Sequence, residues 1–289
     1  MLIHENPKQT LQGRVIIVGA RSFLGAATMS HLRAAGVVVL GLTSDKLDLR
    51  DMSNAKRLGE MLRPNDSVIM FAALTPDKGH DINAMVDNLR MAETLCAALD
   101  HQPCAHVIYF SSDAVYSTND VIINEQSPTA PINLYGCMHL ARELLFQSRV
   151  KCPLAILRPT MVYGAEDSHN AYGPNRFGRE ARKTQKVTLK GKGEETRDHV
   201  YIDDIAKITF LCLRHRSSGV LNVATGKSIS FFDLAFLIAT ISKKSVEVVC
   251  TERSTPITNR HFDITATKIA FPEFEFTSLK EGLERAQNA

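Results

Sequence analysis

The chain has 289 residues; 44% are hydrophobic, 22% are charged, and 34 Lys and Arg against 31 Asp and Glu give a formal net charge of +3. This composition is typical of a globular protein, excludes a disordered or collagen-like chain, and gives no electrostatic reason to expect nucleic acid as a partner. No apolar run approaches the roughly 18–20 residues that span a bilayer, and the N-terminus lacks the apolar stretch of a signal peptide, so we expect a soluble cytoplasmic protein with no membrane partner.

Short apolar runs alternate with helical patterns through the first half of the chain. The first run, at 15–18, is followed by a glycine turn and a helical pattern from about 23 to 35. Further strands are predicted at 37–42, 67–72, 107–110 and 155–157, and further helices at 53–62, 82–98 and 134–146. Strands that alternate with helices in this way predict an α/β protein with a doubly wound parallel sheet, the Rossmann fold.

The alternation ends near Gly164, where a stretch rich in Gly, Asn, Asp and Pro begins. We therefore predict a dinucleotide-binding Rossmann domain at 1–165 and a smaller, mostly substrate-binding C-terminal lobe at 166–289. The segment at about 196–225 is expected to return to the Rossmann domain, because 220–225 is a short apolar run typical of a buried strand. Residues 1–12 are expected to form a loose extension.

The 6 Cys and 10 His of the chain show no spacing typical of a metal site. Scattered cysteines without a C-x-x-C pair are typical of reduced thiols in a cytosolic enzyme. We therefore expect no bound metal ion.

A glycine-rich loop follows the first predicted strand and reads Gly19-Ala20-Arg21-Ser22-Phe23-Leu24-Gly25. Gly19 suits the tight turn out of the strand, and Gly25 suits close packing of the helix that follows. The start of that helix offers free N–H groups to a pyrophosphate, so the loop predicts a dinucleotide site. Ser22 stands where the usual motif has its middle glycine. An ordinary strand-to-helix turn is the alternative.

The residues around the second predicted strand bear on which cofactor binds. NAD-binding folds place a carboxylate near the end of this strand to hold the ribose 2′-hydroxyl, but here no acid occurs until Asp45. Arg21 lies in the glycine loop, where it could bind a 2′-phosphate. This combination predicts NADP, with NAD possible, and a solvent-exposed Arg21 without such a role is the alternative.

Two further segments carry hydroxyl groups suited to proton transfer. Ser112 follows the strand predicted at 107–110, and Tyr135 opens a predicted helix about twenty residues later. His139 lies at i+4 from Tyr135, on the same helical face. A tyrosine, a serine and a basic neighbour form an acid/base set for a reaction in which a nicotinamide cofactor moves a hydride. A capping serine and a core tyrosine are the alternative.

Together these motifs resemble those of the extended short-chain dehydrogenase/reductase family, specifically its NAD(P)-dependent nucleotide-sugar epimerases, dehydratases and reductases. The resemblance extends from Gly13 to Leu283. It rests on GARSFLG, the LDLRD segment, FAAL at 71–74, Asn88, SSDAVY, the Tyr135 helix, LRPTMVYG at 157–164 and RDHVYIDD at 197–204.

The resemblance implies roles for individual residues. Tyr135 would be the general acid/base, and Ser112 would orient and polarise the substrate. Asn88 would help organise the active-site helix and its water, with an Asn on the helix surface as the alternative. Asp48 and Leu49 would meet the adenine. Ala72 and Ala73 would lie on the cofactor side of the sheet. Asn175 and Arg197 would contact the diphosphate of the substrate, with Arg197 in a surface ion pair as the alternative. A homodimer through the helices at 82–98 and 134–146 is also implied.

The sequence departs from the family pattern at two positions. The family motif is Tyr-x-x-x-Lys, and His139 stands at the lysine position, where it would contact the cofactor ribose but would be mostly neutral at pH 7. Dehydratases of the family carry an Asp-Glu pair after the catalytic hydroxyl, and here the pair is Asp113-Ala114. The expected reaction is therefore reduction of a keto-sugar or epimerisation. The alternatives are a dinucleotide-binding protein with weakened catalysis and a family reductase for a carbonyl substrate without a nucleotide.

Overall fold

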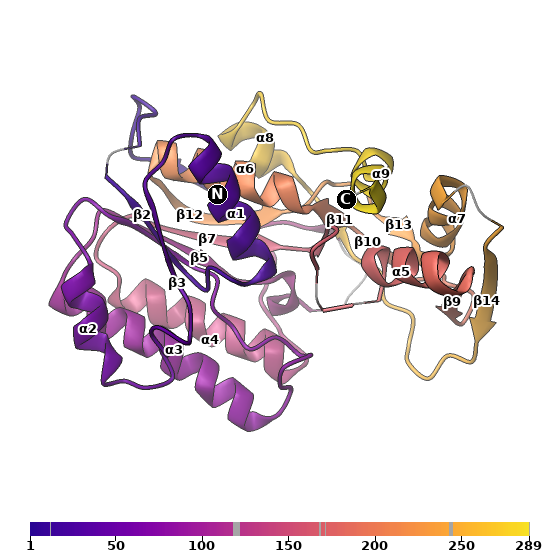
Figure 1. The fold of residues 1–289 in the computed structure, drawn as a ribbon, viewed down its shortest axis with the longest axis horizontal. Coiled ribbons are helices and arrows are strands. Elements are labelled where there is room, and N and C mark those ends of the chain that lie inside the picture. Colours follow the sequence, from indigo (N-terminus) through magenta and orange to yellow (C-terminus); the bar gives the residue numbers. More distant parts are fainter. Residues whose placement is uncertain (12, 118–121, 168, 171, 243–244, 289) are drawn as a thin grey trace.

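The computed structural model describes residues 1–11, 13–117, 122–167, 169–170, 172–242 and 245–288. A seven-stranded sheet lies at the centre of the molecule (Figure 1). From edge to edge its strands are β1 (Ile3–His4), β12 (Ser217–Val223), β7 (Leu154–Pro159), β5 (His106–Phe110), β4 (Ser67–Met70), β2 (Val15–Val18) and β3 (Val39–Leu42). All neighbours in this sheet pair in parallel except β1, which is antiparallel to β12.

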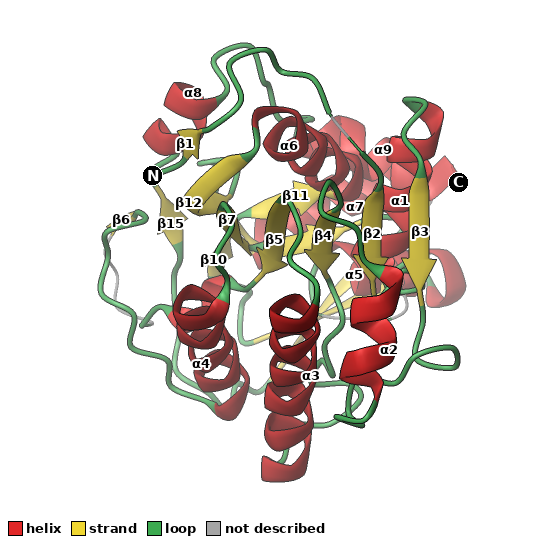
Figure 2. Ribbon diagram, turned by 90° about the vertical axis from the view of Figure 1, so that its left-hand side faces the viewer, coloured by secondary structure: helices red, strands yellow, loops and turns green. Residues whose placement is uncertain are grey.

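Helices cover both faces of the sheet, and this explains why its central strands are continuously apolar. Figure 2 shows three helices side by side on one face, with α6 (Ile202–His215) on the other. The three are α2 (Asn54–Met61), α3 (Ile82–His101) and α4 (Leu134–Arg149). Helix α1 (Phe23–Ala34) packs beside α6. Successive β2 side chains alternate between the two layers: Ile17 packs with Leu32 of α1, and Ile16 with Leu95 of α3.

The order of the strands creates a switch point between β2 and β4. The chain passes from β2 to β3 at one edge and then crosses to β4 on the opposite side of β2. In such sheets a crevice opens at the carboxyl ends of the strands where the direction of winding reverses. Gly19 follows β2 with φ +89°, and a Cβ there would lie 2.7 Å from the backbone nitrogen of Ala72, just beyond β4. The close approach of these two strand ends therefore requires glycine.

A second group of elements lies at one end of the molecule (Figure 1). Parallel strands β9 (Lys186–Lys190) and β14 (Glu247–Thr251) pair there beside α5 (Pro174–Thr184) and α7 (Phe231–Ser242). Phe177, Leu189 and Leu234 belong to the apolar core of this group. The remaining elements are β6 (Ile122–Ile123), β8 (Met161–Tyr163), β10 (Thr196–Arg197), β11 (His199–Tyr201), β13 (Ile229–Ser230), β15 (His261–Phe262), α8 (Thr265–Ala270), α9 (Leu279–Asn288) and the 3₁₀ helix η1 (Asp113–Val115).

The predicted α/β class and mostly parallel sheet are confirmed, and the predicted strands and helices of the first half lie within a few residues of those observed. The apolar run predicted at 220–225 corresponds to β12, which lies between β1 and β7 in the main sheet. The domain boundary at 165/166 stays a prediction. Among the helices that the structure describes, none combines the length and the hydrophobicity needed to cross a bilayer.

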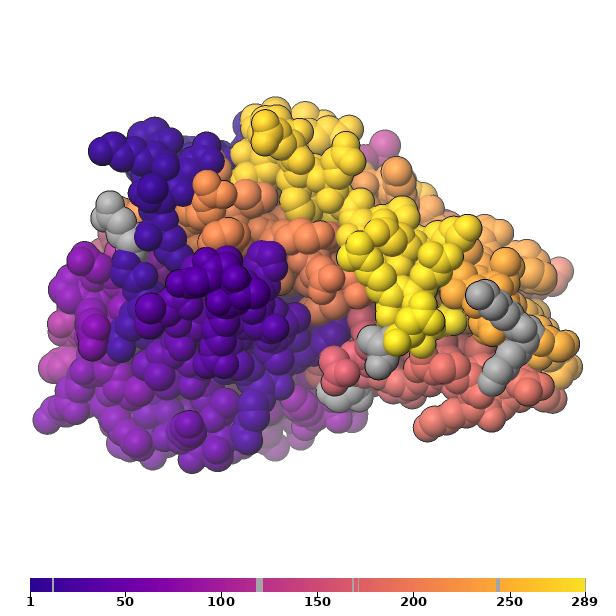
Figure 3. Space-filling view, turned by 45° about the horizontal axis from the view of Figure 1, so that its top comes forward, coloured from indigo at the N-terminus to yellow at the C-terminus, as the bar shows by residue number. Residues whose placement is uncertain are grey.

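The prediction of a loose N-terminal extension is wrong for its first residues. Leu2 is buried in the core, and Ile3 and His4 pair with Ser218 and Ser217 of β12. The His4 ring also reaches the Ala270 carbonyl, with 2.9 Å between Nε2 and the oxygen. Figure 3 shows the N-terminal residues beside later parts of the chain. The physical reason is that the outer edge of β12 needs hydrogen-bond partners, and two residues are too few for a recognisable strand pattern.

Candidate active site

A cavity of about 370 Å³ lies at the carboxyl ends of β2, β3 and β4, and we call it the cofactor groove. It is lined by residues that the sequence assigned to the cofactor, namely Gly19, Arg21, Ser22, Asp48, Leu49, Ala72 and Ala73. The structure therefore brings together three segments of the chain that the sequence assigned separately. Their position at the switch point is where doubly wound sheets bind dinucleotides.

The glycine loop is shaped so that the start of α1 borders this groove. Ser22 is the N-cap of α1, and its Oγ accepts a hydrogen bond from the Gly25 nitrogen at 3.1 Å. A serine in place of the middle glycine therefore caps the helix. At Gly25 itself, a Cβ would collide with the Gly19 carbonyl. The positive end of the α1 dipole and its free N–H groups suit a pyrophosphate at this place.

The charged side chains around the groove do not separate NAD from NADP. Arg21 is 67% exposed and forms an ion pair with Asp45, the first acid after β3. Arg50 binds Asp48 at 2.7 Å, and this hydrogen bond lowers the pKa of the Asp48 carboxyl. Lys78 adds a third cationic side chain to the lining, beside Arg21 and Arg50.

A second cavity, of about 480 Å³, adjoins the groove and is here called the catalytic cavity. The two share Ser22, Ala73 and Lys78 in their linings. The catalytic cavity is lined by Phe23 and Leu24 of the glycine loop and by the predicted catalytic residues Ser112, Tyr135 and His139. A molecule bound along the groove would therefore end beside these three side chains.

The helix that carries Tyr135 begins directly against the turn that carries Ser112. Asn133 caps α4 by accepting from the Gly136 nitrogen at 2.9 Å, and a Cβ at Gly136 would collide with the Ala114 carbonyl. This close contact sets the start of α4 beside η1. Burial raises the pKa of Tyr135 to about 12, with Asp113 adding to the rise and Ser112 opposing it through a hydrogen bond. The phenol therefore holds its proton at neutral pH.

His139 lies in the wall of the catalytic cavity and has one free ring nitrogen. Its Nδ1 is 2.8 Å from the Tyr109 hydroxyl, while its buried Nε2 has no hydrogen-bond partner among the residues that the structure describes. The ring meets that of Tyr135 edge-on, with 4.6 Å between centroids. Burial, and then the charge of Arg142, hold the pKa of His139 well below its ordinary value. A neutral imidazole with an unsatisfied nitrogen suits a ribose hydroxyl, so the residues present fit a bound dinucleotide.

Asn88 lies outside the catalytic cavity, with all its polar atoms bonded. Its Oδ1 accepts from the Leu74 nitrogen at 2.9 Å, and its Nδ2 donates to the carbonyls of Leu74 and Ala84. The side chain thus ties α3 to the loop that follows β4. That loop also carries Asp77. Asp77 and His169 both line the catalytic cavity, and the Asp77 Oδ1 lies 2.8 Å from the His169 Nδ1.

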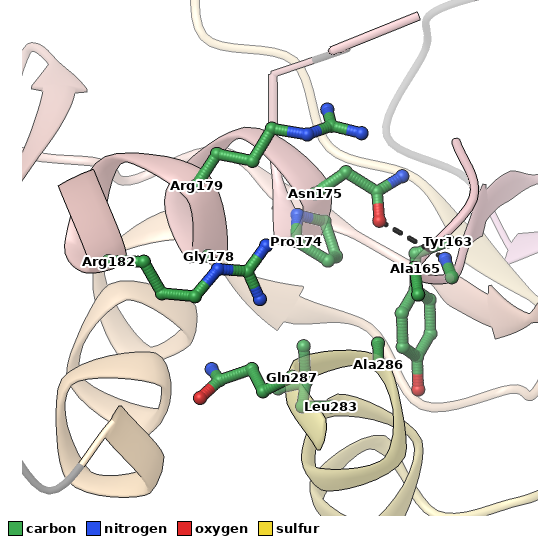
Figure 4. A pocket seen from close by; sticks show the side chains of 11 residues that line it. Tyr163, Ala165, Pro174, Asn175, Gly178, Arg179, Arg182, Leu283, Ala286 and Gln287 are labelled. Atoms are coloured by element: carbon green, nitrogen blue, oxygen red, sulfur yellow. Dashed lines mark hydrogen bonds between the residues drawn. The ribbon is translucent and has the colours of Figure 1, made fainter. Parts of the chain in front are cut away.

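The two predicted diphosphate ligands also lie outside the lining of the catalytic cavity. Asn175 faces a small cavity between α5 and α9, where its Oδ1 accepts from the Gly164 nitrogen at 3.1 Å (Figure 4). Its Nδ2 donates to Asp167 at 2.6 Å, so Asn175 holds a loop whose Asp167 does line the catalytic cavity. Arg197 is engaged by Thr258, with 2.6 Å between Nη2 and the hydroxyl, and lies 3.7 Å from Glu195.

Asp113, which follows Ser112, and Arg260 form an ion pair that the sequence did not assign to the site. Asp113 lines the catalytic cavity, and burial raises its pKa although the charges of Arg260 and Arg197 lower it. The Arg260 Nη1 is 3.2 Å from the Asp113 Oδ2. Asp113 could have been found from its place in SSDAVY. Arg260 lies in an irregular segment with no local signal, so only the tertiary structure reveals it.

Comparison with known families adds to this geometry. The family described as NAD dependent epimerase/dehydratase matches residues 15–224. The chain belongs to this family. The matched residues include those that line the cofactor groove, and they include Ser112, Tyr135 and His139. The resemblance to extended short-chain dehydrogenase/reductases is confirmed.

Solved structures show how the fold of this family member compares with others. A UDP-glucose 4-epimerase from Thermus thermophilus, solved with NAD, is 21% identical over 96% of this chain and 98% of its own, with a TM-score of 0.82. A UDP-N-acetylglucosamine 4-epimerase from Methanobrevibacter ruminantium, solved with UDP-N-acetylmuramic acid, is 22% identical over 96% and 98%, with a TM-score of 0.84. A GDP-L-fucose synthetase from Naegleria fowleri is 18% identical over 98% and 94%, with a TM-score of 0.84. These likenesses establish the fold over nearly the whole chain.

Proposed function

We propose that the protein is an NAD(P)-dependent oxidoreductase or epimerase that acts on a nucleotide-activated sugar, with Tyr135 as the acid/base. The observation that carries the proposal is the wall of the catalytic cavity, where Ser112 and Tyr135 lie beside His139 at the end of the cofactor groove. Family membership supports the cofactor class. The nucleotide sugars that appear in the names of the three solved relatives support the substrate class.

The chemistry of the site follows from the protonation states of its side chains. A bound nicotinamide dinucleotide would supply the hydride donor or acceptor. Ser112 and Tyr135 would hydrogen-bond the reacting sugar oxygen, and Tyr135, with a pKa of about 12, would deliver its proton to a carbonyl oxygen. His139 would hold a ribose hydroxyl with its free Nε2. The site is therefore better prepared for reduction of a carbonyl than for oxidation of an alcohol near pH 7.

Reduction or C4 epimerisation is the better assignment within this family. Dehydratases carry an Asp-Glu pair after the catalytic hydroxyl. Here Asp113 matches the aspartate, and Ala114 stands in place of the glutamate, so one of the two carboxylates for water elimination is absent. Asp113 is bound to Arg260. Incubation with nucleoside-diphosphate hexoses should therefore release no water. A product lighter by about 18 daltons, the mass of water, in mass spectrometry would contradict the assignment.

Turnover of nucleotide sugars by wild type and Tyr135→Phe tests the proposed function. Wild type should oxidise, reduce or epimerise at least one member of a panel of UDP-, GDP- and dTDP-sugars and their 4-keto forms. Tyr135→Phe should lose turnover by at least about a hundredfold, since a positioned acid/base contributes about 10²–10⁴, and should bind the dinucleotide as wild type does. Undiminished turnover by Tyr135→Phe would overturn the assignment.

A dinucleotide-binding protein with weakened catalysis is the second candidate, and the neutral His139 favours it. The family lysine is a permanent cation, whereas burial keeps the His139 ring uncharged. Tight dinucleotide binding without turnover of any nucleotide sugar or simple carbonyl compound would make this candidate the better account. Turnover of a carbonyl compound without a nucleotide would instead identify a different substrate class.

We also propose a homodimer that forms through α3 and α4. Both helices carry large apolar side chains exposed by 38–59%, namely Ile82, Val86, Leu134 and Leu144. Light scattering of the purified protein should give twice the mass of one chain, and Leu144→Glu should lower it to that of a monomer. A monomeric wild type at micromolar concentration would contradict the proposal.

A further inference from the structure

Arg142 differs from the other deeply buried arginines that the structure describes. Arg158 and Arg260 each face a carboxylate, at 2.6 Å from Glu143 and 3.2 Å from Asp113. Arg142 is fully buried, yet within the described ranges no carboxylate lies within 4.0 Å of its guanidinium nitrogens. A buried and unpaired charge is costly. Such a feature is often retained at a functional site.

The guanidinium of Arg142 contacts the wall of the cofactor groove. Its Nη2 donates to the Ala72 carbonyl at 3.0 Å, and Ala72 lines the groove. Its Nη1 is 3.5 Å from the Asn88 Oδ1, and in the described part of the chain its Nε has no hydrogen-bond partner. The carbon of the guanidinium lies 5.0 Å from the ring centroid of Tyr109, whose hydroxyl contacts His139.

Helix geometry places Arg142 on the same face of α4 as the predicted acid/base, two turns further along the helix. Tyr135, His139 and Arg142 occupy positions i, i+4 and i+7 of α4, and therefore share one face. The charge of Arg142 lowers the pKa of both Tyr135 and His139. Two carboxylates oppose this effect on Tyr135, namely Asp113 after β5 and Asp77 after β4. The charge of each raises the pKa of Tyr135.

The arrangement explains why position 139 is not a cation. A lysine at 139 would place a second buried positive charge one turn from Arg142, and among the described residues neither position has a carboxylate partner. A histidine avoids this repulsion by remaining neutral, and its free Nε2 still offers a hydrogen bond toward the cavity. In the family that the sequence resembles, one lysine provides both the charge and the hydrogen bond. Here Arg142 carries the charge and His139 offers the hydrogen bond.

We propose that Arg142 supplies the permanent positive charge that stabilises the Tyr135 phenolate, and that His139 is left as a neutral hydrogen-bond partner for the cofactor ribose. This inference rests on the proposed function, because it gives Tyr135 an acid/base role. Arg142 contacts neither substrate nor cofactor, so it is a positioning residue and acts through Tyr135. His139 would contact the cofactor directly.

A thermodynamic cycle on the protein without cofactor tests the charge relation. His139→Lys should lower the stability of the protein when Arg142 is present, because it adds a second buried cation. In the Arg142→Gln background, which keeps N–H donors for Ala72, the same change should cost less by at least about tenfold in the unfolding equilibrium constant. Urea unfolding of the four proteins measures this difference. An equal cost in both backgrounds would overturn the proposal.

The pH dependence of alcohol oxidation tests the effect on Tyr135. The tyrosine must lose its proton to act as a base, so the oxidative rate rises with pH. Arg142→Gln should move this rise to higher pH by about one unit, since removing a nearby charge shifts a pKa by this order. Arg142→Lys keeps the charge and should leave the profile in place. Identical profiles for the Gln and Lys variants would reduce Arg142 to a structural role.

The double variant His139→Lys/Arg142→Gln keeps the proposal testable if Arg142→Gln alone does not fold. It carries one buried cation on the face of α4 that holds Tyr135, as in the resembling family, and should fold and oxidise with a profile like that of wild type. If Arg142→Gln alone does not fold, a double variant that also fails to fold would contradict the proposal. The unfolding cycle needs no substrate, so it separates this inference from the proposed function: coupling without any turnover would refute the function and leave the charge relation standing.

Discussion

The cofactor groove is built from segments that follow one another closely, whereas the charged wall around Asp113 is assembled from distant ones. Gly19, Ser22, Asp48 and Leu49 lie within one strand–helix–strand unit and its next turn. Arg260 reaches Asp113 across 147 positions, and Arg197 reaches Thr258 across 61. Local turn chemistry thus shapes the first region, and long-range hydrogen bonds between charged and polar groups shape the second. The two regions should respond differently to substitution and to pH.

Acid should destabilise the protein strongly through His199 of β11, which lies two residues after Arg197, is buried, and has no hydrogen-bond partner for either ring nitrogen among the described residues. Burial lowers its pKa to about 3. The unfolded chain, with an ordinary histidine pKa near 6.5, binds more protons than the folded one, so stability is full above pH 6.5 and falls as pH decreases. His199→Phe should remove this loss, about 3 kcal/mol between pH 7 and pH 4.

Urea unfolding at both pH values measures the difference between wild type and His199→Phe. His106 also contributes to the acid sensitivity of wild type, since burial lowers its pKa to about 4, so only the difference between the two proteins belongs to His199. The exposed His80→Asn variant is the control and should behave as wild type. If wild type and His199→Phe differ in free energy of unfolding by the same amount at pH 7 and at pH 4, His199 is not a buried neutral group.

Gly19→Ala should damage the cofactor side alone. The added Cβ would lie 2.7 Å from the Ala72 nitrogen, and this contact separates the two strand ends that form the groove. Dinucleotide affinity should fall by at least about a hundredfold. Gly36→Ala is the matched control, because Gly36 has a similar φ of +77° but nothing within 4 Å of the added Cβ. Both variants carry backbone strain, and only Gly19→Ala should lose binding in a fluorescence titration.

Arg197→Ala should damage the substrate side alone. Arg197 anchors the segment before Arg260 through the Thr258 carbonyl and hydroxyl. Its loss removes these charge-assisted hydrogen bonds, which are worth about 2 kcal/mol, so binding of a nucleoside diphosphate should weaken by up to this amount while dinucleotide affinity is unchanged. Calorimetric titrations of UDP, GDP and NADP(H) would measure both. Equal losses for the two ligand classes would mean that Arg197 supports the whole fold rather than this region.

The smallest expected effect is the choice between NADP and NAD. Arg21, Arg50 and Lys78 line the groove, but Arg21 must leave its ion pair with Asp45 to reach a 2′-phosphate. The preference for NADP(H) should therefore be modest, about tenfold or 1.4 kcal/mol. Arg21→Ala should abolish it and leave NAD(H) affinity unchanged. Tighter binding of NAD(H) by wild type in parallel fluorescence titrations would reverse the assignment.

Much of the fold could be predicted because the parallel strands are short apolar runs between glycines and helical patterns. The glycine loop and the Tyr135 helix were found for the same reason, since each is defined by residues within a few positions of one another. The two-residue strand β1 was missed because its pairing with β12 joins residues more than 200 positions apart. Asn175 also had a recognisable motif, yet its side chain faces the loop at 164–167 rather than the catalytic cavity.

The sequence by itself determined the α/β class, the glycine turn at the first strand, and the spacing that places Tyr135 and His139 on one helical face. These depend on backbone preferences and periodicity, which act between near neighbours. The tertiary structure decided which charges are left without a counter-ion. Arg142 is an ordinary helix residue in the sequence, and only packing against Ala72, Asn88 and Tyr109 makes it a buried, unpaired cation. Burial and pairing depend on all the surrounding segments at once, so no local pattern carries them.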